Sequence, residues 1–124
     1  MSTFWLEMLG GEVRYYDAAG VRTRALEAGR GAPLLLLHGT GGHAESWIRN
    51  VLPLGADFHV YAVDMVGHGF THKPLLDYTP RDYAAHLVAF MDAAGIARAH
   101  VTGESLGGWV ALWLASTIPS AWIG

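Results

Sequence analysis

The chain carries a Gly-x-Ser-x-Gly segment at residues 103–107. A serine flanked in this way is typical of a very tight strand-to-helix turn, in which larger side chains at Gly103 and Gly107 would collide. The turn pushes the Ser105 hydroxyl outward, and the free N–H groups and dipole of the following helix would stabilise negative charge on a substrate oxygen. The segment therefore predicts that Ser105 is a nucleophile for acyl transfer.

Alternating strands and helices are expected to position this serine. The expected strands are residues 12–16, 21–28, 34–37, 58–63 and 99–102, and the expected helices are residues 44–52, 80–94 and 106–117. The short apolar runs suit strands that are covered on both faces. The alternation from Leu34 onward predicts an α/β fold, with a mainly parallel sheet and flanking helices. We expect one domain over residues 1–124.

Three segments resemble the α/β-hydrolase family, in the family's order and over almost the whole chain. They are LLLLHGTGG, VYAVDMVGHGFTHKP and VTGESLGGWVALWLA. The resemblance implies that Ser105 is the nucleophile and that the backbone N–H groups of Thr40 and Leu106 form the oxyanion hole. A serine at this position disfavours the branches that use an aspartate nucleophile, the epoxide hydrolases and haloalkane dehalogenases.

Within the family, the chain is similar to carboxylesterases and to carbon–carbon bond hydrolases of aromatic-ring degradation. The second group is suggested by the segments GTGGHAESW and DMVGHGFTHKP. Those hydrolases commonly have Asn immediately before the serine, whereas this chain has Glu104. The resemblance thus implies cleavage of an ester or a related bond next to a carbonyl, in a small-molecule substrate.

A serine nucleophile needs a histidine base, and that base needs an acid. In this family both follow the nucleophile on later strands, whereas here the sequence ends at Gly124. We therefore expect a partial fold, truncated after the nucleophile helix. His38 is the candidate base because its turn should face Ser105; the alternative is that His38, like His68, braces its loop.

Asp64 and Glu104 also allow two interpretations each. Asp64 ends a strand at the same edge as Ser105, where it could orient a histidine or cap a turn. Glu104 could act in acid–base chemistry or could be a solvated acid at the start of a helix. For both residues we favour the structural role.

Composition excludes several other classes of function. The net charge is −3 and the 8 Lys and Arg residues are dispersed, so we expect no nucleic-acid partner. There is no cysteine, and the histidines show no metal-ligand spacing, so we expect neither a metal nor another cofactor. No apolar run is long enough to span a bilayer, and the N-terminus does not resemble a signal peptide, so we expect a cytoplasmic protein without membrane contact.

A second hypothesis is a catalytically inactive half-domain that self-associates. Without later strands, residues 99–102 would be an open sheet edge. The helix at 106–117 would also expose some of its large side chains, among them Trp109, Leu112 and Trp113. Either hypothesis predicts a homo-oligomer formed through this edge.

Overall fold

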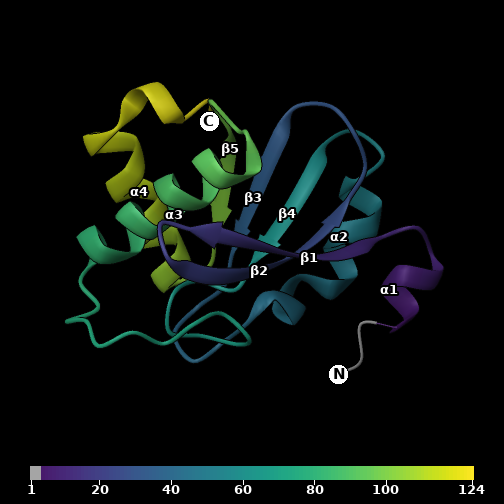
Figure 1. The fold of residues 1–124 in the computed structure, drawn as a ribbon. Coiled ribbons are helices and arrows are strands. Elements are labelled where there is room, and N and C mark those ends of the chain that lie inside the picture. The colour runs from purple at the N-terminus through teal and green to yellow at the C-terminus, as the bar shows by residue number, and fades with distance from the viewer. Residues whose placement is uncertain (1–3) are drawn as a thin grey trace.

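A five-stranded mixed sheet forms the centre of the protein (Figure 1). The computed structural model describes residues 4–124. The strands are β1 (Glu12–Ala18), β2 (Val21–Ala28), β3 (Pro33–Leu37), β4 (His59–Val63) and β5 (His100–Gly103). They lie in the order β1-β2-β4-β3-β5. β3 is parallel to both β4 and β5, whereas β1 and β2 pair antiparallel, so the parallel part begins at β3, as expected.

Helices cover both faces of this sheet. They are α1 (Phe4–Met8), the 3-10 helix η1 (Ala44–Trp47), α2 (Ile48–Leu54), α3 (Pro80–Ala94), α4 (Leu106–Thr117) and the 3-10 helix η2 (Pro119–Ala121). Figure 1 shows the sheet between α3 and α4 on one side and α1 and α2 on the other. No helix in residues 4–124 is long and apolar enough to cross a membrane.

The leucines of β3 explain why the strand lies in the middle of the sheet. Leu35 and Leu37 pack in the core cluster under α3 and α4, whereas Leu34 and Leu36 pack in the cluster under α1 and α2. Alternate side chains of a strand point to opposite faces, so an uninterrupted apolar run fills both cores. Each buried leucine contributes about 1.5–3 kcal/mol, and the expected strand covered on both faces is confirmed.

The termini of α3 also form as the sequence predicts. The Thr79 side chain accepts a hydrogen bond from the Asp82 N–H, and the Asp82 carboxylate accepts one from the Thr79 N–H, which makes a reciprocal capping box. Gly95 ends the helix in the left-handed conformation, with φ of 73°. These local signals fix where the helix begins and ends.

Two helical segments differ from expectation. The helix expected at residues 44–52 is a 3-10 turn followed by α2, which extends to Leu54 and includes Pro53. The 3-10 turn begins at Ala44, whose N–H donates to the Asp64 carboxylate. The short helix α1 was not predicted, because five residues are too few for a periodic pattern.

The outer edge of β5 is partly occupied rather than fully open. Residues 121–124 lie along it: Ala99 N–H donates to Ala121 C=O at 3.0 Å, and Ile123 N–H donates to Ala99 C=O at 2.8 Å. Val101 N–H donates to Gly124 C=O at 2.9 Å. The bridge between Ala99 and Trp122 is parallel. The tail therefore covers one end of the edge that we expected to be free, whereas Trp109 and Leu112 of α4 are exposed, as expected.

Candidate active site

Ser105 lies in the tight turn between β5 and α4. Its backbone has φ of 52° and ψ of −114°, a left-handed conformation that is rare for a residue with a side chain. Ser105 is exposed and stands at the N-cap of α4 without making a side-chain cap hydrogen bond. A strained conformation that leaves the hydroxyl free is the geometry that the Gly-x-Ser-x-Gly pattern predicts.

The two flanking glycines are required by close backbone contacts. A Cβ atom on Gly103 would lie 2.1 Å from the carbonyl carbon of Gly107. One on Gly107 would lie 2.2 Å from the carbonyl oxygen of Leu37 at the end of β3. Both distances are far shorter than any real contact, so the turn closes against itself and against β3 only with glycine at these positions.

The turn after β3 lies directly against this serine turn. A Cβ atom on Gly39 would be 3.6 Å from the Ser105 Cβ, and Glu104 N–H donates to Leu37 C=O at 3.1 Å. Gly42 N–H donates to Gly39 C=O at 3.0 Å and closes the turn that contains Thr40. Within residues 4–124 neither the Thr40 N–H nor the Leu106 N–H donates a hydrogen bond. The two adjoining turns thus each contain an unpaired backbone donor: Leu106 follows Ser105 in the chain, and Thr40 follows Gly39.

His38 is buried and both of its ring nitrogens have partners. Nδ1 lies 2.8 Å from Gly39 C=O, and Nε2 accepts a hydrogen bond from Met65 N–H at 3.0 Å. Burial lowers the pKa of this imidazole below its ordinary value. The neutral ring therefore donates through Nδ1 and accepts through Nε2, which leaves no nitrogen to take a proton from Ser105. These contacts favour the bracing role over the role of base.

His68 likewise contacts its own loop. Its Nδ1 lies 3.1 Å from Val66 C=O, and its ring centroid lies 4.8 Å from that of His38. None of the hydrogen bonds found in residues 4–124 joins a histidine to the Ser105 hydroxyl. Over the same residues, no group of three or more His, Cys, Asp or Glu side chains is arranged to hold a metal ion.

A buried ion-pair group that the sequence did not reveal lies behind the Thr40 turn. Arg24 of β2 donates from Nε to Asp64 at 2.7 Å and from Nη1 to Glu45 at 2.9 Å, and Nη2 donates to both carboxylates. The exposed fraction of the side chain is 4% for Arg24, 6% for Glu45 and 0% for Asp64. Because Arg24 lies 21 residues from Glu45 and 40 residues from Asp64, no local pattern connects them.

Asp64 also caps the surrounding loops. Its carboxylate accepts hydrogen bonds from Ala44 N–H at 2.6 Å and from Phe70 N–H at 2.9 Å. A Cβ atom on Gly69 would lie 2.3 Å from this carboxylate, so the loop can approach only with glycine there. The capping interpretation of Asp64 is therefore confirmed.

The charges of this group are stabilised mutually. Burial alone would raise the pKa of Glu45, but hydrogen bonds and attraction from Arg24 hold that pKa below its ordinary value. Burial would lower the pKa of Arg24, but the two carboxylates raise it overall. Glu45 and Arg24 are therefore both ionised at neutral pH and form an ion pair.

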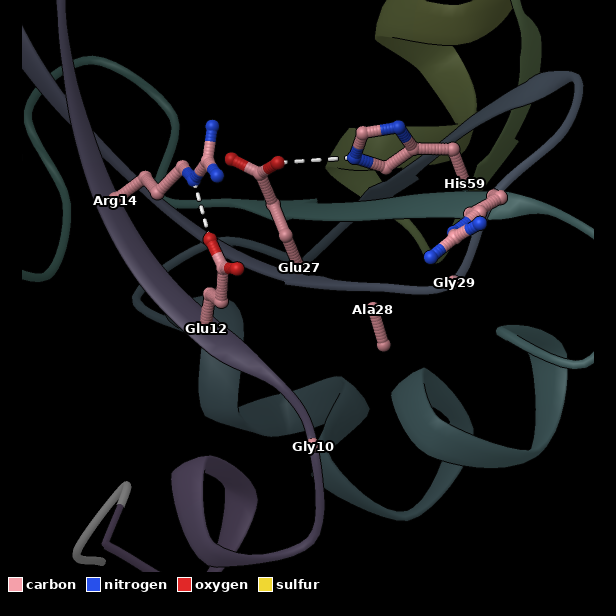
Figure 2. A pocket seen from close by; sticks show the side chains of 8 residues that line it. Gly10, Glu12, Arg14, Glu27, Ala28, Gly29 and His59 are labelled. Atoms are coloured by element: carbon pink, nitrogen blue, oxygen red, sulfur yellow. Dashed lines mark hydrogen bonds and ion pairs between the residues drawn. The ribbon is translucent and has the colours of Figure 1, made fainter.

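A polar hollow of about 300 Å³ lies at the other end of the sheet. Figure 2 shows Glu27 there, pointing toward His59, with Arg14 and Glu12 beside it. Glu27 accepts hydrogen bonds from His59 Nε2 at 3.0 Å and from the Tyr16 hydroxyl. The acidic groups of this hollow are already paired with side chains of the same sheet, and the hollow is remote from Ser105.

The fold and the serine turn together define the class of protein. A family model described as "alpha/beta hydrolase fold" matches residues 32–121, and the chain belongs to this family. The family resemblance and the fold class that we inferred from the sequence are thus confirmed.

Two relatives are similar to this chain over most of its length. The 2-hydroxy-6-oxo-6-(2'-aminophenyl)hexa-2,4-dienoic acid hydrolase of Metapseudomonas resinovorans is 44% identical over 100 residues, or 77% of this chain and 34% of the relative. The dihydrolipoyllysine-residue acetyltransferase component of the acetoin cleaving system of Cupriavidus necator is 39% identical over 107 residues, or 86% of this chain and 29% of the relative. The chain therefore spans about a third of the length of these relatives.

Solved structures show the same arrangement. A membrane phospholipase A described as a bacterial virulence factor superposes with a TM-score of 0.90 at 30% identity, over 96% of this chain and 39% of that protein. Nearly every element of the present chain thus has a counterpart in a known member of the family.

Proposed function

We propose that this chain supplies the nucleophile and the oxyanion hole of a serine hydrolase. The observation that carries the proposal is the strained, exposed Ser105, in a turn that adjoins the turn of Gly39 and Thr40; the N–H groups of Thr40 and Leu106 are unpaired. Ser105 Oγ would attack a substrate carbonyl carbon, and the two N–H groups would donate to the oxygen as it becomes negative.

Full turnover also needs a base to accept the Ser105 proton. The hydrogen bonds of His38 argue against that residue, because both of its nitrogens are already engaged. We infer that the base and its acid come from outside the residues described. With its base removed, a serine nucleophile retains only the contribution of the oxyanion hole and of substrate binding.

The substrate class that we propose is an ester or a carbon–carbon bond next to a carbonyl group. The relatives support this range, since one is a hexadienoic acid hydrolase and one a phospholipase by name. Attack on a carbonyl carbon is the step that both reactions would share. Glu104, in place of the Asn that is common in carbon–carbon bond hydrolases, favours the ester.

Reaction with a fluorophosphonate probe tests the proposal. The phosphonyl oxygen would occupy the same hole as the substrate oxyanion, so Ser105 should react faster than any other serine. Peptide mapping should find the adduct on Ser105; Ser105→Ala should reduce labelling to background, and Ser120→Ala, at an exposed serine, should leave it unchanged. Labelling that is spread over surface serines, or that persists in Ser105→Ala, would contradict the proposal.

A second candidate function is self-association without catalysis. Trp109 and Leu112 on α4 are 61% and 70% exposed, which is unusual for large apolar side chains on one helix. A second copy of the chain packed against this face would bury them and could extend the sheet beyond residues 121–124. Sedimentation equilibrium at micromolar concentration tests this: a dimer supports it, and a monomer throughout the range contradicts it.

A further inference from the structure

The Thr40 turn is fastened at both of its ends to buried groups. Before Thr40, the ring of His38 is held by the Met65 N–H. After Thr40, the Ala44 N–H is held by Asp64, and the Glu45 carboxylate is held by Arg24. Only residues 39–43 lie between these two attachments.

Arg24 connects the second attachment to the sheet. It belongs to β2, and its guanidinium binds Glu45 on one side and Asp64 at the end of β4 on the other. A guanidinium is planar and its N–H donors have fixed directions, so paired bonds to a carboxylate fix orientation as well as distance. Arg24 therefore fixes the position of Glu45, and of the turn that precedes it, relative to β2 and β4.

A contribution to the folding free energy does not by itself explain why Arg24, Glu45 and Asp64 are buried together. Buried ion pairs recover little more than their desolvation cost, and apolar side chains of similar volume often stabilise a fold equally well. A buried ion pair can instead select one arrangement among several of similar energy. The arrangement selected here is that of the turn whose residue Gly39 lies next to Ser105, since a Cβ atom added to Gly39 would be 3.6 Å from the Ser105 Cβ.

We propose that Arg24 is a positioning residue, which acts through Glu45 and Asp64 to hold the Thr40 N–H at the height of the Ser105 hydroxyl. The inference rests on the proposed function insofar as that N–H serves as an oxyanion donor. A donor must lie about 2.7–3.1 Å from the developing oxyanion, so a turn that moves by about 1 Å loses much of its effect.

The chain offers a matched pair of variants to test this. Glu45→Gln keeps the shape of the side chain but removes the charge that Arg24 binds, and it leaves the Arg24–Asp64 pair intact. Glu27→Gln makes the same change in the polar hollow at the opposite end of the sheet, where the carboxylate is equally buried, with 4% of its side chain exposed against 6% for Glu45. Both variants lose a buried carboxylate, but only one touches the Thr40 turn.

Two readouts separate positioning from general stability. The first is hydrogen exchange of the Gly42 and Ala44 amides by NMR, which donate to Gly39 C=O and to the Asp64 carboxylate, measured relative to the most protected amides of β3. The second is the second-order rate of fluorophosphonate labelling at Ser105. In Glu45→Gln we expect exchange at Gly42 and Ala44 to accelerate and labelling to slow by about tenfold. In Glu27→Gln we expect neither change.

The outcomes distinguish this inference from the proposed function. If the wild-type protein does not label, the proposed function fails, but faster exchange confined to Glu45→Gln still supports the positioning role. If Gly42 and Ala44 exchange equally in both variants, the positioning role is overturned even where labelling persists. Should Glu45→Gln not fold, Glu45→Asp serves instead, because it keeps the charge but is too short to reach Arg24 with the turn in place; unchanged exchange there would overturn the inference.

Discussion

Both ends of the sheet contain a buried glutamate, but the two glutamates hold different segments of the chain in place. At the end near Ser105, Glu45 lies in the 3-10 helix η1, directly after the Thr40 turn, and is held by Arg24. At the opposite end, Glu27 lies within β2 and binds Tyr16 of β1 and His59 of β4. The strands there are already placed by their backbone ladders, whereas the Thr40 turn has no ladder. Glu27 therefore adds to a strand arrangement that the backbone ladders already fix, whereas Glu45 fixes the position of a turn that has no such ladder.

The largest expected effect comes from the arginines of the two ends. Arg24→Gln leaves the buried Glu45 and Asp64 carboxylates without their counter-charge, and we expect it to lower the free energy of unfolding by about 3–5 kcal/mol. Arg14→Gln breaks a pair with Glu12 in which both side chains are more than half exposed, so we expect no resolvable change. Urea unfolding followed by tryptophan fluorescence measures both, and equal losses would remove the distinction between the two ends.

A glycine pair near Ser105 tests how tightly that end is closed. An alanine in a helix normally stabilises relative to glycine, but at Gly107 its Cβ would lie 2.2 Å from the Leu37 carbonyl oxygen. We expect Gly107→Ala to cost about 3 kcal/mol. Gly39→Ala meets ordinary contacts at 3.6 Å and should change stability by less than about 1 kcal/mol. A stable Gly107→Ala protein, measured by the same urea unfolding, would mean that the turn can open.

The smallest of the three effects depends on pH and on His86, which also holds the loops near Ser105. Its Nδ1 accepts from Val66 N–H at 3.1 Å, its Nε2 lies 2.8 Å from the Thr23 hydroxyl, and burial lowers its pKa to about 4. An unfolded histidine has a pKa of about 6.5, so the unfolded chain binds the extra proton first. The contribution of His86 to the free energy of unfolding is therefore fully present above pH 6.5 and is lost as the pH falls toward 4.

Between pH 7 and pH 4.5 the loss from His86 amounts to about 2.5 kcal/mol. His86→Gln should reduce the pH dependence of the unfolding free energy by this amount, whatever its effect at pH 7. His59→Gln, at the opposite end, is the control, since the His59 side chain is already 33% exposed. An unchanged pH dependence in His86→Gln would show that this ring binds its proton as readily in the folded protein as in the unfolded chain.

The sequence predicted the features that depend on neighbouring residues. The strands and α4 follow from apolar runs, the ends of α3 follow from Thr79 and Gly95, and the serine turn follows from its two glycines. The contacts of Arg24 could not be predicted, because in β2 it looks like an ordinary polar residue in an alternating strand. Its partners lie 21 and 40 residues away and are brought together only by the folded chain.

The same distinction applies to two expectations that the structure qualifies. His38 was the candidate base because its turn faces Ser105, but the sequence does not show that Met65 and Gly39 occupy its ring nitrogens. Residues 99–102 were expected as an open edge, but residues 121–124 return along it after the 3-10 turn η2. The surroundings of His38 and of residues 99–102 both depend on the path of a loop, and that path cannot be predicted from the pattern of side chains.

The strand order has a consequence for how the chain is made. β3 pairs with β4 and β5, both of which come later in the sequence, and β5 ends 66 residues after Leu37. At a synthesis rate of about 5–20 residues per second, the four leucines of β3 wait for about 3–13 s before both neighbours exist. During that time the most apolar strand of the protein has at least one unpaired edge, which is the situation in which nascent chains aggregate. A ribosome-bound chain that ends before residue 100 should therefore depend on chaperones that shield apolar segments.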